Sequence, residues 1–310
     1  MTGANTRPRF WLSYRGHRVN FTSPSHPRQQ HHRRLRTLPE LPEVERAASA
    51  LRAAIQDAII ERVEVLHPSL RRRLTPKTLH ALRGTRVRGI ERRGKHQLIH
   101  LEDGRVLHVH FRMNGDWVIG TSFDVLPRFA RAVIQLGNDI RVVLEDSRAL
   151  STLDVHAAGV PLPIELGPEP TDPSLTPQTL RASLIRRRLP IKVALLDQRI
   201  IAGLGNIYAA EALWRARIDP RVPSASLDLA EVRRLLTAIR AVLARATGGR
   251  YTDRAGARLD VYDRAGRACR RCGEKIIRIV QSGRSTYFCP RCQRRRRGAK
   301  VSRAPRSRRS

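Results

Sequence analysis

The chain has 310 residues, of which 41% are hydrophobic, and its 60 lysines and arginines against 27 aspartates and glutamates give a net charge of +33. A chain of this length and hydrophobic content can bury a core, which excludes a wholly disordered protein. No apolar run approaches the ~18 residues that a membrane-spanning helix needs, so we expect no membrane partner.

The excess of positive charge favours a polyanionic partner, and nucleic acid is the commonest one. Residues 1–37 hold eight arginines and no acid, and residues 293–310 hold eight arginines, one lysine and no acid. Basic residues also outnumber acidic residues between these two segments, so the folded part of the chain is itself basic. A solvated arginine-rich surface that reflects biased codon usage is the alternative interpretation.

The first 37 residues show no hydrophobic periodicity, and we expect them to be disordered or not translated. A helix is predicted from about residue 42, because Pro42 and Glu43 suit a first turn and apolar residues then recur at helical spacing as far as Ile55. The next segment alternates short apolar runs with turn residues, which predicts a β-sandwich; with the leading helix it forms an expected domain over 38–160.

The Pro-rich residues 161–177 predict a linker, and a helical domain is expected over 178–256. Asp228 and Glu231 resemble a capping box at the start of a helix in that domain. Residues 257–293 contain all four cysteines, and 294–310 form a basic tail of low complexity that we expect to be disordered.

The four cysteines follow the pattern C-x2-C-x16-C-x2-C, at Cys269, Cys272, Cys289 and Cys292. Two pairs of thiolates on tight turns suit the tetrahedral coordination of zinc. Two disulfides are the alternative, but residues 1–37 have no apolar stretch for a secretory signal, and a reducing cytoplasm disfavours disulfides. We therefore expect one zinc ion, which is structural because four protein ligands leave no open position.

Two other segments are more specific. The first is LPELPEVE at residues 38–45, and the second is residues 195–213, which contain Gly203-Leu204-Gly205-Asn206. Together with the four-cysteine module, and in this order, they resemble the formamidopyrimidine-DNA glycosylase and endonuclease VIII family of bacterial DNA repair enzymes over residues 38–293. The resemblance implies an α+β multidomain fold: an N-terminal β-sandwich with a leading helix, a central helix-two-turns-helix domain and a C-terminal zinc finger. It also implies a monomer of the bacterial cytoplasm and nucleoid that acts on damaged double-stranded DNA.

The nucleophile of that family is an N-terminal proline, exposed when the initiator methionine is removed, whose secondary amine forms a Schiff base with the damaged nucleotide. The resemblance gives this role to Pro39, whose nitrogen is a tertiary amide without a usable lone pair as the chain is printed. Leu38 stands where the family has methionine, and leucine codons of the UUG or CUG kind can start bacterial translation. We therefore expect the mature protein to begin at Pro39, with residues 1–37 an artefact of start-site assignment; proteolytic removal is the other route.

The resemblance implies three further catalytic residues. Glu40 matches the general acid that protonates the sugar oxygen or the leaving group. Lys95 matches a lysine that assists elimination and contacts phosphate, and Arg284 matches a zinc-finger arginine that binds the phosphates flanking the lesion and assists the second elimination. Glu43 either faces the same pocket or stabilises the first helical turn.

Phosphate contacts are implied for Asn206, Lys192, Arg187 and Arg148. The segment 203–206 precedes a predicted helix, so its backbone N–H groups are also expected to cradle a phosphate.

The family flips the damaged nucleotide out of the duplex and fills the gap with side chains. Met113 fits the main wedge, with a core methionine as the alternative. The other wedges lie in a loop with the family pattern Asp-x-Arg-Arg-Phe-Gly, where this chain has Asp-Ser-Arg-Ala-Leu-Ser at residues 146–151. Leu150 thus replaces the aromatic residue and stacks less well. The loop between Gly249 and Val261 is also short, so the sequence leaves open whether oxidised purines or pyrimidines are preferred.

Three functions are therefore compared. The first is a bifunctional DNA glycosylase and abasic-site lyase that breaks the strand by β,δ-elimination. The second is a non-catalytic damaged-DNA-binding relative in which the N-terminal extension blocks Pro39. The third, a zinc-ribbon nucleic-acid protein such as a ribosome-associated factor, explains the charge and the cysteines but not the two specific segments.

Overall fold

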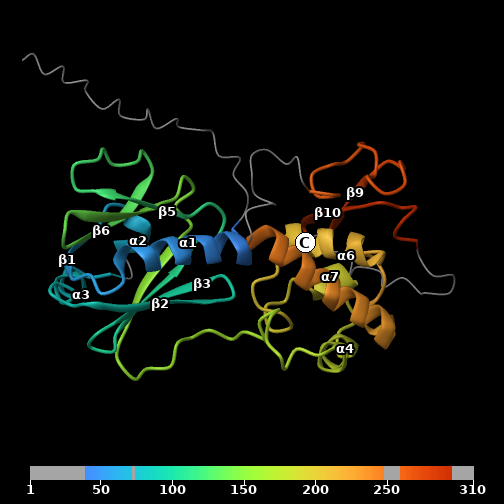
Figure 1. Cartoon of the computed structure of the whole chain (residues 1–310), viewed down its shortest axis with the longest axis horizontal. Helices are drawn as coiled ribbons and strands as arrows, with labels where there is room; N and C mark the ends of the chain where they lie inside the picture. Colours follow the sequence, from blue (N-terminus) through green and yellow to red (C-terminus); the bar gives the residue numbers. More distant parts are fainter. Residues whose placement is uncertain (1–38, 72–73, 248–258, 295–310) are drawn as a thin grey trace, which may run out of the picture. The chain divides into compact units, whose positions relative to one another are not determined.

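The structure is a computed structural model that describes residues 39–71, 74–247 and 259–294, all within one compact unit (Figure 1). Residues 1–38, 72–73, 248–258 and 295–310 lie outside the described residues. They include residues 1–37 and nearly all of 294–310, for which the sequence predicts disorder, and most of the short loop between Gly249 and Val261. The elements in chain order are α1 (Leu41–Ile55), β1 (Ile60–Val65), α2 (Pro68–Arg71), α3 (Pro76–His80), β2 (Val87–Arg93), β3 (His96–Leu101), β4 (Val106–His110), β5 (Asp116–Thr121), β6 (Ala130–Leu136), β7 (Ile140–Glu145), β8 (Thr152–His156), α4 (Pro177–Ile185), α5 (Ile191–Ala194), α6 (Asn206–Ala216), the 3-10 helix η1 (Ser224–Ser226), α7 (Leu229–Thr247), β9 (Ile277–Gln281) and β10 (Arg284–Phe288).

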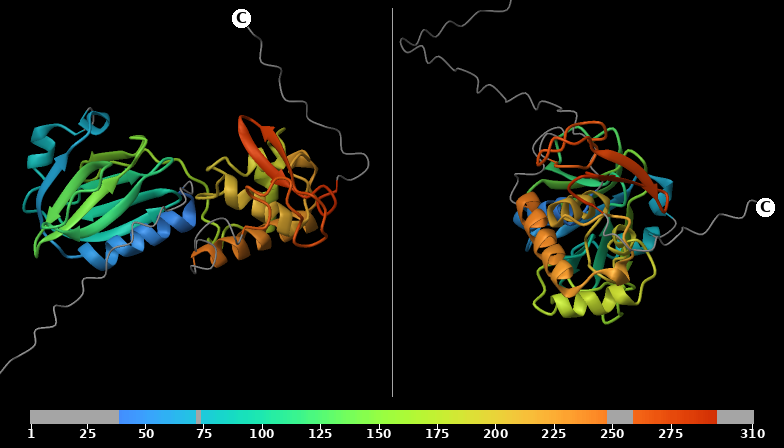
Figure 2. Two further views of the ribbon diagram at one scale, coloured as in Figure 1. Left: turned by 90° about the horizontal axis from the view of Figure 1, so that it is seen from above. Right: turned by 90° about the vertical axis from the view of Figure 1, so that its right-hand side faces the viewer.

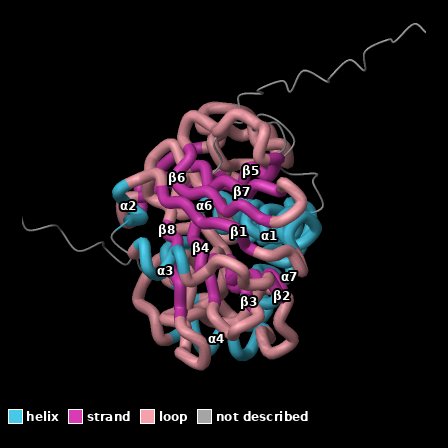
Figure 3. The backbone as a smooth tube through the Cα atoms, turned by 90° about the vertical axis from the view of Figure 1, so that its left-hand side faces the viewer, coloured by secondary structure: helices cyan, strands magenta, loops and turns pink. Residues whose placement is uncertain are grey.

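The first eight strands form two antiparallel four-stranded sheets, with strand orders β1-β6-β7-β5 and β2-β3-β4-β8. Figure 3 shows the two sheets as separate layers. Both sheets contribute side chains to one buried cluster, for example Val142 from β7 and Leu107 and Val109 from β4. Alternate residues of β4 face away from this core, as expected for a strand with period two. The predicted β-sandwich is therefore confirmed.

Helix α1 packs against both sheets of the sandwich, and its apolar residues Val44, Ala48, Leu51 and Ile55 are all buried. The helix begins with a capping box between Glu40 and Glu43, and a proline lies in its first turn. The leading helix predicted from the spacing of these residues is confirmed, and its first turn carries residues of the predicted site.

Helices α4 to α7 form a second core, to which α6 and α7 contribute most of the buried side chains. The predicted capping box of α7 is present: Glu231 N donates to Asp228 Oδ1 at 2.8 Å, and Asp228 N donates to Glu231 Oε2 at 3.0 Å. The segment before α4 has no regular secondary structure as far as Thr176, but it is packed, since Leu175 belongs to the helical core.

Strands β9 and β10 form a hairpin in which Gln281 pairs with Arg284. The two turn residues, Ser282 and Gly283, both have positive φ angles, as in a type I′ turn, which matches the twist of the strands. The hairpin module packs against α6 through Trp214. Figure 2 shows the hairpin (red) next to the helical domain. The α+β organisation expected from the sequence is confirmed. Among the described residues, no helix has the length and apolar character needed to cross a bilayer.

Candidate active site

The carboxylate of Glu40 lies at the N-terminus of α6. Its Oε1 accepts the backbone N–H of Ile207 at 2.8 Å and its Oε2 accepts that of Tyr208 at 3.2 Å. The first N–H groups of a helix have no intrahelical partner and carry partial positive charge, so they suit an anion. The sequence predicted that backbone N–H groups around residues 203–206 would cradle a phosphate. In the structure the next two N–H groups along the chain, those of Ile207 and Tyr208, bond to the side chain of Glu40, the N-cap residue of α1.

Two glycines make this approach possible. A Cβ atom at Gly205 would lie 2.3 Å from Cδ of Glu40, and one at Gly203, whose φ is +82°, would lie 2.5 Å from Cδ1 of Leu41. The backbone of α1 also bonds to this loop, because Leu41 N donates to Gly203 O at 3.1 Å. The Gly-x-Gly pattern therefore lets the start of α1 dock on the start of α6.

Glu40 is only 2% exposed, and this burial governs the protonation of its carboxyl. Burial raises the pKa of its carboxyl to about 7; the nearby Glu43 acts in the same direction, while Lys95 and the two helix N–H groups oppose it. A carboxyl with this pKa carries a proton in an appreciable fraction of molecules at neutral pH. It can therefore act as a general acid.

Tyr208 is a part of the site that sequence reasoning missed. Its hydroxyl donates to Glu43 Oε1 at 2.5 Å, while Glu43 Oε2 accepts the backbone N–H of Glu40 at 3.0 Å. Glu43 thus caps the first turn of α1 and also faces the buried site, so both roles considered for it from the sequence are present at once. The one available signal for Tyr208 was a phenol in the apolar run that follows Asn206.

Two lysines, Lys95 and Lys192, interact electrostatically with the Glu40 carboxyl, and Arg284 interacts with both lysines. Lys95 lies in the β2–β3 turn, where burial lowers its pKa; Glu40 raises that pKa and Arg284 lowers it. Lys192 on α5 is fully buried, and burial lowers its pKa to about 8, with Arg284 acting in the same direction. Arg284 itself is exposed at the start of β10. The structure therefore brings Glu40, Lys95, Lys192 and Arg284 together around one place where an anion is favoured.

Lys192 and Asn206 share one acceptor on the zinc-module hairpin. Asn206 Nδ2 donates to the carbonyl oxygen of Ser285 at 3.0 Å, and Lys192 Nζ lies 3.4 Å from the same oxygen. Asn206 Oδ1 is buried and has no hydrogen-bond partner within the described part of the chain. These two residues, predicted as phosphate contacts, thus join α5 and α6 to β10. Pro39 is half-buried next to Glu40.

The residues predicted to fill the DNA gap lie on two neighbouring loops. Met113 is half-buried in the β4–β5 turn, and Leu150, in the β7–β8 loop, is 44% exposed. Asn114 Nδ2 donates to Ser147 Oγ at 3.2 Å, which joins the two loops.

A buried aspartate shapes the β7–β8 loop. Asp146 accepts the backbone N–H groups of Arg148, Leu150 and Ser151 at 2.9, 2.7 and 2.8 Å. The Arg148 side chain is exposed, so it remains available to a partner.

Arg187 stands apart from this group. It lies between α4 and α5, and its Nη2 donates to Asp197 Oδ2 at 3.2 Å. The same carboxylate also accepts a hydrogen bond from the guanidinium of Arg199, and hydrogen bonds from these two arginines lower the pKa of Asp197 to about 2. Arg187 therefore has a charged protein partner, and the contacts described here do not connect it to Glu40.

The four cysteines converge as predicted. Their sulfur atoms all lie within 4.8 Å of one another, with 3.9 Å between Cys269 and Cys292 and 3.5 Å between Cys272 and Cys289. Four sulfurs bound at ~2.3 Å to a tetrahedral zinc lie roughly 3.8 Å apart, so the cluster fits the ion. Trp214 Nε1 donates to the Cys269 sulfur at 3.4 Å and orients this ligand. The module holds a structural zinc.

Three family models match successive parts of the chain. They are described as the formamidopyrimidine-DNA glycosylase N-terminal domain (residues 38–153), the formamidopyrimidine-DNA glycosylase H2TH domain (166–254) and a zinc finger found in FPG and IleRS (266–295).

Curated relatives and solved structures agree with these matches. A formamidopyrimidine-DNA glycosylase of Paracoccus denitrificans is 40% identical over 280 residues, which cover 83% of this chain and all of the relative. One of Moorella thermoacetica is 41% identical over 259 residues, which cover 78% of this chain and 94% of the relative.

Among solved structures, Lactococcus lactis formamidopyrimidine-DNA glycosylase bound non-covalently to DNA with an AP site matches with a TM-score of 0.77 and 31% identity. MutM in complex with DNA containing carbocyclic 8-oxo-G matches with a TM-score of 0.77 and 30% identity. Each match covers 83% of this chain and all of the other.

Proposed function

The chain belongs to the formamidopyrimidine-DNA glycosylase family, and we propose that it removes oxidised bases from double-stranded DNA and then cleaves the strand at the abasic site. One observation carries the proposal: a buried carboxyl with a pKa of about 7 lies directly after Pro39 and near Lys95, which in turn lies near Arg284. This arrangement can supply a proton at neutral pH and attract the phosphates of a flipped nucleotide.

In the first step, the nitrogen lone pair of Pro39 forms a bond to the anomeric carbon of the damaged nucleotide, and the bond from that carbon to the base breaks. Glu40 gives its proton to the leaving base or to the sugar ring oxygen, and the proton that the Pro39 nitrogen loses goes to the other. The bond between the anomeric carbon and the ring oxygen then breaks, which opens the sugar and yields the Schiff base. Removal of a proton from the neighbouring sugar carbon then expels the 3′ phosphate, and a second elimination expels the 5′ phosphate. Lys95 and Arg284 assist these two eliminations.

This chemistry requires a free amine at Pro39, so we propose that the active form begins there. Two comparisons support the proposal: the family model starts at residue 38, and 83% of this chain matches the Paracoccus relative over its whole length. The intact mass of the protein from its native cells tests it. A mass that includes residues 1–37 in an active preparation would refute it.

The same cations would bind the DNA backbone. A phosphate next to the flipped nucleotide would take the place of the Ser285 carbonyl as acceptor for Lys192 and Asn206, and Arg284 would close on it from the hairpin. Arg148 and Arg187 would bind further phosphates. Met113 and Leu150 would enter the gap that the flipped nucleotide leaves.

Borohydride trapping on lesion duplexes tests the function. We expect a chain that begins at Pro39 to be captured covalently on duplexes with oxidised bases and to nick them. The 310-residue chain is the matched control, since its Pro39 nitrogen is an amide, and it should not be captured. If both forms bind damaged DNA and neither is captured, the protein is a non-catalytic damage-binding relative. A panel of oxidised purines and pyrimidines, each opposite different bases, then identifies the preferred lesion.

A further inference from the structure

We propose that Glu169 is a positioning residue that holds Lys95 in place for strand cleavage; this inference rests on the proposed function, because it concerns the same site. Glu169 lies in the segment between the sandwich and α4, in the sequence Gly167-Pro168-Glu169-Pro170, and its side chain is 13% exposed. None of the roles assigned above uses this carboxylate, although it makes charged contacts with a catalytic turn.

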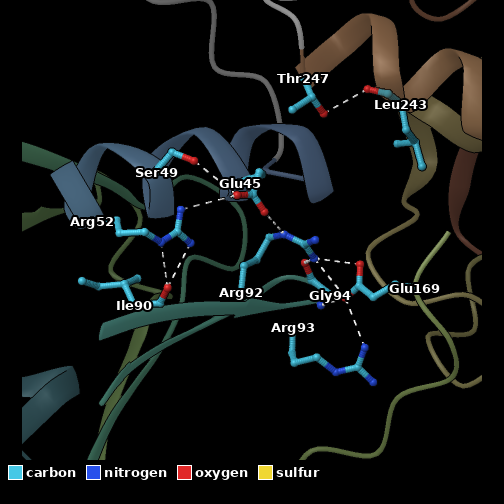
Figure 4. Close-up of polar contacts among 10 residues, drawn as sticks. All are labelled: Glu45, Ser49, Arg52, Ile90, Arg92, Arg93, Gly94, Glu169, Leu243 and Thr247. Atoms are coloured by element: carbon cyan, nitrogen blue, oxygen red, sulfur yellow. Dashed lines mark hydrogen bonds and ion pairs between the residues drawn. The ribbon is translucent and has the colours of Figure 1, made fainter. Parts of the chain in front are cut away.

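The carboxylate of Glu169 forms several hydrogen bonds with the β2–β3 turn that carries Lys95 (Figure 4). Its Oε1 accepts the backbone N–H of Gly94, the residue before Lys95, at 2.6 Å. Nη1 of Arg92 donates to both carboxylate oxygens, at 3.0 and 2.9 Å. Nη1 of Arg93 approaches Oε1 at 3.5 Å. One side chain therefore fixes three successive residues immediately before Lys95.

Arg92 connects this turn to α1. Its Nε donates to Glu45 Oε2 at 2.5 Å, and its Nη1 also donates to the carbonyl of Gly94 at 3.1 Å. Burial lowers the pKa of Arg92, but Glu45 and Glu169 outweigh it and the pKa is raised. Arg92 thus stays charged between two carboxylates. The series of ion pairs from Glu169 through Arg92 to Glu45 therefore joins the Lys95 turn to α1, the helix that begins directly after Glu40.

The turn also has little room to move. Gly94 has a φ of +56°, and a Cβ atom there would lie 3.0 Å from Leu166 Cδ1 and 3.3 Å from the backbone nitrogen of Gly203. Gly203 belongs to the loop that leads into α6, so the Lys95 turn is packed against the loop that supports Glu40. Within the described residues the Lys95 amine makes no hydrogen bond of its own, so the backbone of this turn sets where the amine lies.

A carboxylate is required at position 169 because two acceptor oxygens serve an amide N–H and a guanidinium at once. Glutamine has the same size but only one acceptor oxygen, and its NH2 group would face Arg92. Glu169→Gln therefore loosens the turn and leaves the volume of the side chain unchanged. Glu165→Gln is the matched control, since Glu165 lies in the same segment and is exposed.

The test is the single-turnover rate of strand cleavage at a preformed abasic site by the zinc-loaded enzyme that begins at Pro39, which serves as wild type here. We expect Glu169→Gln to cleave about tenfold to a hundredfold more slowly than wild type, because small misplacements of a catalytic group have effects of this size. Glu165→Gln should cleave at the wild-type rate. In a Lys95→Gln background, Glu169→Gln should cause no further loss, since both changes remove the same contribution.

Two results would overturn the inference: a Glu169→Gln variant that cleaves as fast as wild type, or losses that multiply in the double variant, as expected if Glu169 only stabilises the fold. Thermal unfolding of each variant is measured in parallel. If Glu169→Gln does not fold, Glu169→Asp replaces it, because it keeps the charge but shortens the reach, and it must show the same non-additive loss with Lys95→Gln. Failure of wild type to cleave would instead refute the proposed function.

Discussion

Gly205 has no room for a side chain, because a Cβ atom there would lie 2.3 Å from Cδ of Glu40. This close approach places the Glu40 carboxylate on the first N–H groups of α6. The glycine at the start of one helix therefore determines where the acid at the start of another helix lies.

We predict that Gly205→Ala reduces base excision by about tenfold or more, because the added methyl group displaces Glu40 from its two N–H donors. Overpacking of this kind also destabilises a fold by roughly 1–3 kcal/mol, which urea unfolding measures. Gly89→Ala is the matched control, since a Cβ atom at Gly89 meets nothing within 4 Å. Equal excision rates for the two variants would show that the contact is not needed.

The raised pKa of Glu40 predicts the pH dependence of base excision. Below a pH of about 7 the carboxyl holds its proton, and above it the proton is lost, so a step that needs the acid should slow as the pH rises through about 7. Glu40→Gln should lower the rate and remove this alkaline decline. The measurement is the single-turnover excision rate between pH 5.5 and about 9. An unchanged alkaline limb in the Glu40→Gln variant would assign the acid to another group.

Histidines on the sheet β2-β3-β4-β8 predict sensitivity to acid. His96 Nδ1 lies 2.7 Å from His108 Nε2, and burial lowers the pKa of His96 to about 4 and that of His110 to about 3, with the neighbouring histidines and cations adding to the effect. The unfolded state takes up protons below its ordinary pKa of about 6.5, while the folded state resists them. The free energy of unfolding should therefore fall as the pH drops from about 6.5 toward 4.

His110→Asn should reduce this loss of stability by on the order of 2 kcal/mol at pH 4.5, because it removes one histidine that the folded state keeps unprotonated. Asparagine keeps an acceptor for the backbone N–H of Arg112, which bonds to His110 Nδ1 at 2.9 Å. The exposed His80 provides the control variant, His80→Asn, which should follow wild type. Denaturant unfolding at a series of pH values measures the difference, and identical slopes in all three proteins would contradict the prediction.

Zinc removal should weaken DNA binding before it unfolds the sandwich. The hairpin that carries Arg284 and the Ser285 carbonyl packs around the cysteine cluster, whereas the sandwich has its own buried core. Chelation, or Cys272→Ser, should raise the dissociation constant for lesion DNA about tenfold or more, since several phosphate contacts depend on the hairpin. Fluorescence should also change, because Trp214 bonds to Cys269. Loss of the sandwich's β-sheet circular dichroism on chelation would show that the two parts unfold together.

Local patterns in the sequence were sufficient for much of the fold. The spacing of Val44, Ala48 and Leu51 predicted α1, Asp228 and Glu231 predicted the start of α7, and the cysteine spacing predicted the zinc module. Each of these signals lies within a few residues or within one motif, where helix periodicity, capping and ligand geometry act directly.

The missing parts of the site depend on contacts between distant segments. The sequence around Glu169 does not indicate that this residue bonds to Gly94. The sequence around Ser285 likewise does not indicate that its carbonyl oxygen accepts hydrogen bonds from both Lys192 and Asn206. The use of the α6 N–H groups by Glu40 was missed for the same reason. A helix N-terminus attracts any anion, and only the folded structure shows that the anion at the start of α6 is the carboxylate of Glu40.

The way Asp146 holds the β7–β8 loop has a consequence for how this enzyme can diversify. The aspartate bonds to backbone N–H groups, so the loop keeps its path without help from the side chains at Ala149 and Leu150. They are two of the three positions where residues 146–151 depart from the family pattern, the third being Ser151. Leu150, which we propose enters the gap in the DNA, can therefore be exchanged by evolution or by design while the backbone of the loop keeps the same path.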